Sequence, residues 1–517
     1  MTKLSDSRPA RTVAMMMSIT IIGKIMGVLR DRLQGAEFGT HAAEGIAFAQ
    51  ASLLPRSFLD IMFAAAFSAS FIPVFSNYLE TKGKKEAFNL AASFICIVLL
   101  LTTAVTVISI IFAQPISALF FRGEQHPEET LALAVTLLRY MFPLMILSGL
   151  AFSLTGILQT LGEFRIPAAM SIVSNGIILL YFFFFIDRFG VYGLAVAFLI
   201  GWGMQAVIQV PFLIRHKFKF RPNFKDPGLK QIGKLALPVM MGTWVVPINL
   251  MINTSASSQL YGGEFGVPSI LFAHNLFAIV SGLFVLSVAN VIFPKFTRQV
   301  ATKDYNAFSE TVSETFRVLV FFLLPLTIGL MVLSQPLVHF VHYTGEFCET
   351  SVQITSTALM YFSIGIVGYG LLIVLSRACF AMFDGKTPVV AAVLAIIVNT
   401  VLSFTLVPIM EIAGPAFANA IANTAGAAVL VIVLTRKGAL KWNLPVAKDI
   451  IKMVITAAIM LVAVLFSVSQ TAEIHQILQL GITAIVGIAV YLGLATVLKI
   501  KEMNWILRNF LQKGKTN

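Results

Sequence analysis

The chain has few charged residues: Asp, Glu, Lys and Arg make up 12% of its 517 residues, against about 25% in a soluble domain. Hydrophobic residues make up 58%, and the mean hydropathy is +0.88. Many apolar stretches reach about 20 residues, enough to cross roughly 30 Å of hydrocarbon as a helix. A transmembrane β-barrel is excluded, because its strands would alternate polar and apolar residues. We therefore predict an all-α protein with many membrane spans.

The sequence also lacks the motifs of common enzyme and metal sites. It contains three cysteines, whose spacing fits neither a disulfide framework nor a metal site. There is no phosphate-binding P-loop and no nucleophile elbow. A membrane glycan polymerase would need catalytic groups near an outer loop, but Glu124, Glu128 and Glu129 have the pattern of solvated loop charge. We expect a protein that is not an enzyme and has no cofactor or metal site.

Apolar runs separated by short polar loops predict about fourteen membrane spans. Basic residues precede the first run, as in a signal peptide, but no small-x-small cleavage site follows, so we expect an uncleaved first span. The predicted spans cover residues 12–34, 43–78, 88–113, 131–158, 166–186, 190–214, 235–260, 267–294, 316–341, 352–381, 387–408, 412–435, 447–469 and 474–498.

Basic residues gather in alternate loops, and this bias sets the orientation of a membrane protein. Thirty of the 37 lysines and arginines fall on one side, including seven between Arg215 and Lys234. The opposite loops hold only Arg122 and Arg188 and are rich in glutamate. We expect the basic side, with both termini, to be cytoplasmic. Topology then explains the net charge of +13, and we expect no nucleic-acid partner.

The two halves of the chain repeat each other at an offset of 221 residues: Pro73 recurs as Pro294, and Pro115 recurs as Pro336. Each element recurs after six predicted spans, so both halves share one orientation. Such parallel repeats occur in transporters, with the substrate site near the bilayer midplane. We predict an N-terminal lobe of six helices at 1–214, a cytoplasmic linker at 215–234, a C-terminal lobe of six helices at 235–435, and two further helices with a cytoplasmic tail at 436–517.

Several ionisable residues lie in the first two predicted spans, although a charge at the bilayer centre costs at least about 2.5–3.5 kcal/mol. Lys24 and Asp31 are seven residues apart and share a helical face, while Arg30 points elsewhere. Arg56 and Asp60 are four apart and can pair along the helix, so they could equally form a buried structural pair. The six candidates for a charged site are Lys24, Arg30, Asp31, Glu44, Arg56 and Asp60.

The second half of the repeat provides a comparison. Between Lys234 and Lys295, the matching spans hold only Glu264 and His274. If charge served only to pack the repeat, both halves should carry it. We therefore interpret the extra cations of the first half as functional. Their sign favours an anionic substrate, and phosphate is the natural candidate because arginine binds it through two hydrogen bonds.

Polar amides within the later spans suggest a second, weaker site. Asn253, Asn399 and Asn419 could line a cation site. Amides between membrane helices more often only hydrogen-bond across them, and both interpretations stay open.

Four stretches of sequence resemble the MurJ (MviN) lipid II flippases of the multidrug/oligosaccharidyl-lipid/polysaccharide exporter superfamily. They are "GKIMGVLRD" at 23–31, "SASFIPVFSNYL" at 68–79, "INLMINT" at 248–254 and "SRACFAMFDGKTPV" at 376–389. The two six-span halves followed by two extra spans also fit this family. The resemblance covers nearly the whole chain.

The resemblance implies an alternating-access cavity between two lobes, through which the diphosphate and sugars of a lipid-linked glycan pass. The cavity cations of the family match Lys24 and Arg30, with Asp31 following. A family arginine aligns with Asn275 or its neighbour His274. Two carboxylates that form a sodium site in some members appear here as Asn253 and Ser403.

The expected partner is lipid II or a similar undecaprenyl-diphosphate glycolipid, together with membrane lipid. We expect a monomer in the bacterial cytoplasmic membrane. The alternatives are a flippase for another polyprenyl-diphosphate-linked glycan, a related exporter of the superfamily, and a membrane glycan polymerase. The two extra spans argue against a drug exporter, for which twelve spans suffice.

Overall fold

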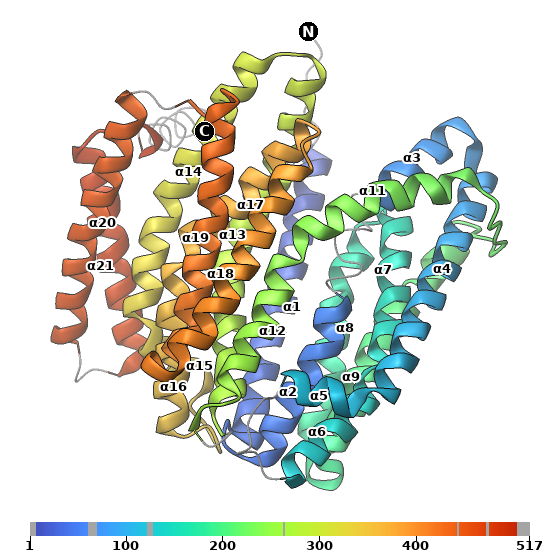
Figure 1. Cartoon of the computed structure of the whole chain (residues 1–517), viewed down its shortest axis with the longest axis horizontal. Helices are drawn as coiled ribbons and strands as arrows, with labels where there is room; N and C mark the ends of the chain where they lie inside the picture. Colours follow the sequence, from blue (N-terminus) through green and yellow to red (C-terminus); the bar gives the residue numbers. More distant parts are fainter. Residues whose placement is uncertain are drawn as a thin grey trace. The chain divides into compact units, whose positions relative to one another are not determined.

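The computed structural model describes residues 7–59, 70–120, 128–261, 264–441, 444–471 and 475–503, and the regular elements in these ranges are all helices (Figure 1). The chain divides into two compact units. One comprises Met1–Met251, Tyr261–Pro268 and Thr344–Phe347, and the other comprises Ile252–Leu260, Ser269–Tyr343 and Cys348–Asn517. The prediction of an all-α protein is therefore confirmed for the part of the chain that the structure describes.

The first unit contains eleven described helices, and α12 and α13 contribute to both units. The first eleven are α1 (Ser7–Phe38), α2 (Ala43–Leu59), α3 (Ile72–Thr81), α4 (Gly83–Ile111), α5 (Ala113–Phe120), α6 (Glu128–Met141), α7 (Leu144–Thr160), α8 (Arg165–Phe184), α9 (Ile186–Val207), α10 (Val210–Arg215) and α11 (Pro227–Thr243). The shared helices are α12 (Val245–Ser257) and α13 (Gly266–Ala301).

The second unit contains the remaining described helices. They are α14 (Tyr305–Val332), α15 (Ser334–His342), α16 (Glu349–Ile364), α17 (Ile366–Ala381), α18 (Lys386–Met410), α19 (Ala413–Arg436), α20 (Leu444–Gln470) and α21 (Gln476–Val497).

Within the described ranges, ten helical segments are long and apolar enough to cross a membrane, and the bent pair α16–α17 could provide an eleventh. This agrees with a multi-pass membrane protein, while the count of fourteen stays a prediction. The first two predicted spans are not among the ten. In α1 the apolar run is interrupted by Lys24, Arg30, Asp31 and Arg32, and the described part of α2 is 17 residues long.

Helix α1 packs closely against α8 in the first unit. A Cβ added to Gly23 would lie 3.1 Å from the Cβ of Ser171, and one added to Gly27 would lie 3.5 Å from Nδ2 of Asn175. Small residues four apart let membrane helices approach closely, which compensates for the lack of a hydrophobic driving force between helices in lipid. The "GKIMG" stretch thus brings the middle of α8 to the charged part of α1.

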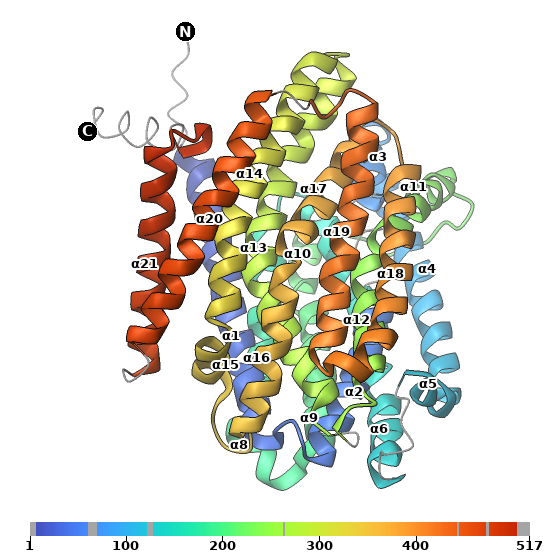
Figure 2. The same cartoon turned by 60° about the vertical axis from the view of Figure 1, so that its left-hand side comes forward.

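Two elements after the twelfth predicted span, α20 and α21, pack side by side in the second unit, and α20 lies along α14 (Figure 2). The Tyr491 hydroxyl donates a hydrogen bond of 2.8 Å to the carbonyl of Phe321 on α14. Beyond the end of α21, Glu502 forms an ion pair of 3.0 Å with Arg317, also on α14, and both side chains are nearly buried. These contacts hold the C-terminal helix pair against α14.

Removing Arg317 should destabilise the second unit, because it leaves Glu502 as a buried charge without its partner, at a cost of about 3–5 kcal/mol. Burial already raises the pKa of Glu502. A protein that contains a carboxyl whose pKa is raised on folding becomes less stable as pH rises through the interval between the ordinary and the folded pKa of that carboxyl. The unfolding temperature of Arg317→Ala should therefore fall further below wild type at pH 8 than at pH 5. The control is Arg298→Ala, because Arg298 is an exposed arginine in the last turn of α13. An equal deficit for Arg317→Ala at both pH values would contradict this account.

Candidate functional site

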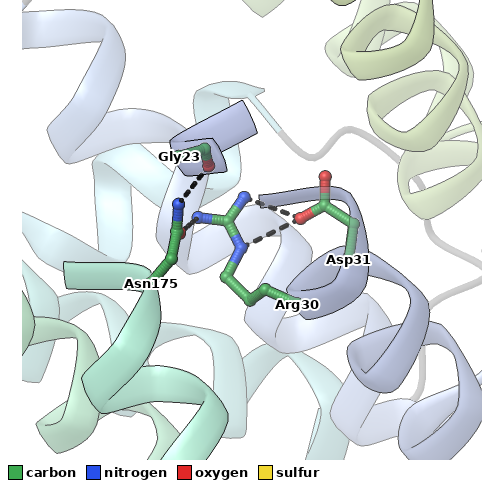
Figure 3. Close-up of polar contacts among 4 residues, drawn as sticks. All are labelled: Gly23, Arg30, Asp31 and Asn175. Atoms are coloured by element: carbon green, nitrogen blue, oxygen red, sulfur yellow. Dashed lines mark hydrogen bonds and ion pairs between the residues drawn. The ribbon is translucent and has the colours of Figure 1, made fainter. Parts of the chain in front are cut away.

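The charged stretch of α1 forms one connected hydrogen-bond cluster (Figure 3). The Arg30 guanidinium donates from Nε and Nη2 to Oδ1 of Asp31, at 3.0 and 2.6 Å. Both side chains are mostly buried, with 16% and 10% of their surfaces exposed. Arg30 also lies over the ring of Phe198 on α9, 5.6 Å from its centroid. A carboxylate, an aromatic face and partial burial therefore fix the orientation of this guanidinium.

The third partner of Arg30 is Asn175, which α8 supplies. Its Oδ1 accepts a hydrogen bond of 3.0 Å from Nη1 of Arg30. Its Nδ2 donates one of 3.1 Å to the carbonyl of Gly23, two turns earlier on α1 (Figure 3). The sequence alone did not point to this residue. The available signal was an isolated amide in the apolar stretch "SIVSNGIILL" at 171–180, but only the packing of α1 on α8 shows what it contacts.

Lys24 lies on the same helix and is exposed. Its ammonium is repelled by Arg56 and Arg30 and attracted by Asp31. Arg56 is half-buried near the described end of α2. Three cations thus act with one carboxylate in this part of the first unit. Because like charges repel strongly where water is scarce, the group is suited to bind an anion that would relieve the repulsion.

The other two candidates from the first two spans are placed differently. Glu44 is exposed in the first turn of α2. The carboxylate of Glu44 repels that of Glu37, and so do those of Asp187 and Glu346. Glu44 is therefore part of an acidic group at the end of α1. Asp60 lies outside the described residues.

His274 and Asn275 lie on α13 in the second unit, and both are half-buried. The His274 ring has its centroid 5.9 Å from that of Phe277 and 5.8 Å from that of Phe362. The imidazole of His274 therefore packs among aromatic rings.

Three of the four polar residues proposed for a cation site come together in the second unit. Oδ1 of Asn253 accepts hydrogen bonds from Nδ2 of Asn399 at 2.9 Å and from Oγ of Ser403 at 3.2 Å. All three residues are fully buried. Asn419 instead accepts a hydrogen bond of 2.8 Å from Asn423, one turn along α19.

The Asn253 oxygen already accepts two hydrogen bonds, so a cation at this oxygen would have to displace at least one of the two donors. A cation site at these residues stays a prediction. No cluster of three or more His, Cys, Asp or Glu side chains that could hold a metal ion occurs among the residues described.

Comparison with known proteins gives a consistent result. The family model "Lipid II flippase MurJ" matches residues 36–483. A probable lipid II flippase MurJ of Vibrio cholerae is 29% identical over 399 residues, which cover 75% of each chain. One of Buchnera aphidicola from Acyrthosiphon pisum is 27% identical over 519 residues, 97% of this chain and 99% of the relative.

Solved structures agree with the sequence relatives. A lipid II flippase MurJ in an inward closed conformation superposes with a TM-score of 0.77 and 25% identity, over 93% of this chain and 98% of the other. An inward-facing multidrug resistance transporter of the MATE family, within the MOP superfamily, gives a TM-score of 0.69 at 14% identity, over 82% and 98%. The second likeness concerns the fold alone.

The contacts of Asn175 predict a role in anion binding through Arg30. We expect Asn175→Ala to lower the affinity of the purified chain for inorganic pyrophosphate by roughly tenfold. This factor corresponds to the free energy of one hydrogen bond to a charged group. Isothermal titration calorimetry would measure this. Asn423→Ala is the matched control, because it removes a buried amide from a hydrogen bond in the second unit. Equal losses of pyrophosphate affinity in the two variants would contradict the role of Asn175.

Proposed function

This chain belongs to the lipid II flippase MurJ family, and we propose that it moves lipid II from the inner to the outer leaflet of the bacterial cytoplasmic membrane. The observation that carries the proposal is Arg30, a guanidinium inside an apolar helix that Asp31 and Asn175 hold in a fixed orientation. A lipid-linked diphosphate is the part of such a substrate that this cation can bind.

The cluster can exchange its internal counter-ion for the substrate. Without substrate, Asp31 neutralises Arg30 and lowers the cost of holding it in the membrane. A diphosphate offers several charged oxygens, which a planar guanidinium can bind in pairs. Lys24 and Arg56 add attraction from the same part of the first unit. Asn175 holds the guanidinium of Arg30 in place while the diphosphate replaces Asp31 as its anionic partner.

No bond of the substrate needs to be broken in this process, so the protein acts as a carrier and not as an enzyme. Within the proposal, the carrier has fourteen spans, formed by the two repeated lobes at 1–214 and 235–435 and the pair of helices in 436–517. Both termini are cytoplasmic, and the protein works as a monomer. Substrate passes by alternating access near the bilayer midplane.

A flippase for a different polyprenyl-diphosphate-linked glycan is the second candidate. The same observation favours it, because Arg30 and its neighbours would recognise a diphosphate and not the sugars or peptide attached to it. Rescue of cells that lack their own lipid II flippase distinguishes the two, since only a protein that accepts lipid II restores growth.

Arg30→Ala should abolish this rescue in cells depleted of their lipid II flippase. Because removal of one partner of a buried pair can cost about 3–5 kcal/mol of stability, the amount of membrane-inserted protein must be measured alongside. Arg30→Lys keeps the charge but loses the paired hydrogen bonds, so we expect partial rescue. Arg139→Ala, at an exposed position in the last turn of α6, is the matched control.

The charge of the first unit further predicts that His274→Ala and Asn275→Ala impair rescue less than Arg30→Ala, compared at equal expression. Full rescue by well-inserted Arg30→Ala would overturn the proposed role of the cluster.

The proposed orientation predicts that a membrane-impermeant maleimide added to intact cells labels Cys348. Partial burial would raise the pKa of this thiol, but hydrogen bonds involving Ser351 and Thr350 outweigh it and lower the pKa. The larger thiolate fraction at neutral pH should speed labelling. Lys225→Cys, in a background without Cys96, Cys348 and Cys379, should be labelled only after the cells are opened. The reverse pattern would refute the orientation.

A further inference from the structure

An open groove of about 460 Å³ runs along the first unit between α8 and α9. Its walls include Ile177 and Leu180 from α8 and Phe189, Val196 and Ile200 from α9. Four of these side chains are strongly exposed: Leu180 by 54%, Phe189 by 52%, Val196 by 43% and Ile200 by 53%. On a membrane protein such a surface faces lipid, and the groove offers a hydrocarbon chain contact on several sides at once.

A break in α9 shapes one end of this groove. Gly190 has φ 49° and ψ −145°, which only glycine adopts easily, and its carbonyl accepts a hydrogen bond of 2.6 Å from the Tyr181 hydroxyl. A Cβ on Gly193 would collide with Tyr181. The tyrosine therefore packs against α9, where it satisfies a polar group that hydrocarbon cannot, and it lines the groove.

Both signs of charge lie at this end of the groove. The Arg188 guanidinium is 5.5 Å from the centroid of the Phe189 ring, which lines the groove. Its sequence neighbour Asp187 is exposed, and its carboxylate repels that of Glu37. Glu37 in turn interacts electrostatically with Tyr181, which lines the groove. Arg188 thus lies beside the apolar surface, and the carboxylates of Asp187 and Glu37 lie in the same region of the first unit.

We propose that this groove binds one phosphatidylethanolamine molecule, with an acyl chain between α8 and α9, its phosphate at Arg188 and its ammonium at Asp187 and Glu37. The ammonium donates hydrogen bonds to carboxylates, which the quaternary ammonium of phosphatidylcholine cannot do. Phosphatidylglycerol carries a net negative charge and has no cation to place beside the two carboxylates. The expected order of affinity is therefore phosphatidylethanolamine, phosphatidylcholine, phosphatidylglycerol. The site does not rest on the transport function.

Native mass spectrometry of the delipidated full-length chain, titrated with each of the three lipids carrying identical acyl chains, tests the proposal. Val196→Phe should fill the groove. By displacing at least two methylene groups of the acyl chain, it should weaken phosphatidylethanolamine binding by about tenfold or more. Val107→Phe on α4 is the matched control, because Val107 is also an exposed valine, at 48%, and does not line the groove. Binding by Val107→Phe should equal that of wild type.

Arg188 and Asp187, the proposed contacts of the lipid head group, are exposed, so their substitution should not affect folding. Arg188→Gln and Asp187→Asn should each weaken phosphatidylethanolamine binding by about two- to fivefold, the range for exposed ion pairs. Asp187→Asn should also reduce the differences between the affinities for the three lipids. Equal affinities for the three lipids in the wild type would overturn the head-group assignment. Unchanged binding by Val196→Phe would overturn the groove as the site.

Discussion

The arrangement of the first unit depends on one constraint: a guanidinium within an apolar helix must have its hydrogen bonds satisfied by protein. Asp31 satisfies two donors of Arg30, and Asn175 satisfies another. Gly23 lets α8 approach α1 closely, and this approach brings Asn175 to Arg30. Asn175 then returns a hydrogen bond to the Gly23 carbonyl. The same close contact that positions α8 therefore also orients the cation, and a bulkier residue at Gly23 would disturb both.

In the second unit, neutral groups form the corresponding buried polar contact between helices. Asn253, Asn399 and Ser403 link α12 to α18 by amide and hydroxyl hydrogen bonds, and all three are buried. Such a link connects two helices through polar atoms without the cost of burying a charge. It carries no charge, whereas the cluster around Arg30 does.

Sequence alone predicted the helical membrane fold, because apolar runs of about 20 residues are typical of helices that cross a membrane. It also selected Lys24, Arg30 and Asp31 as candidates, since the cost of intramembrane charge depends on one helix only. The expectation that Arg30 points away from Asp31 was wrong, because the long arginine side chain turns back to bond Oδ1 of Asp31. Sequence alone could not find Asn175, because that role depends on which helix packs against α1. For the same reason it could not separate Asn419, which bonds to Asn423 on its own helix, from the three residues that meet across helices.

If the proposed function holds, the charges around Arg30 also bear on how the carrier resets. A bound diphosphate offsets most of the excess positive charge of Lys24, Arg30 and Arg56, so the loaded site crosses the membrane field at little cost. The empty site keeps its excess positive charge, and one unit charge moved across 100 mV changes the free energy by about 2.3 kcal/mol. A potential that is negative inside would draw the empty site toward the cytoplasm, where new substrate is made. Asp31 limits this pull, because it neutralises one of the three cations. The carboxylate that makes Arg30 tolerable in the membrane therefore also sets how strongly the membrane potential can drive the return step.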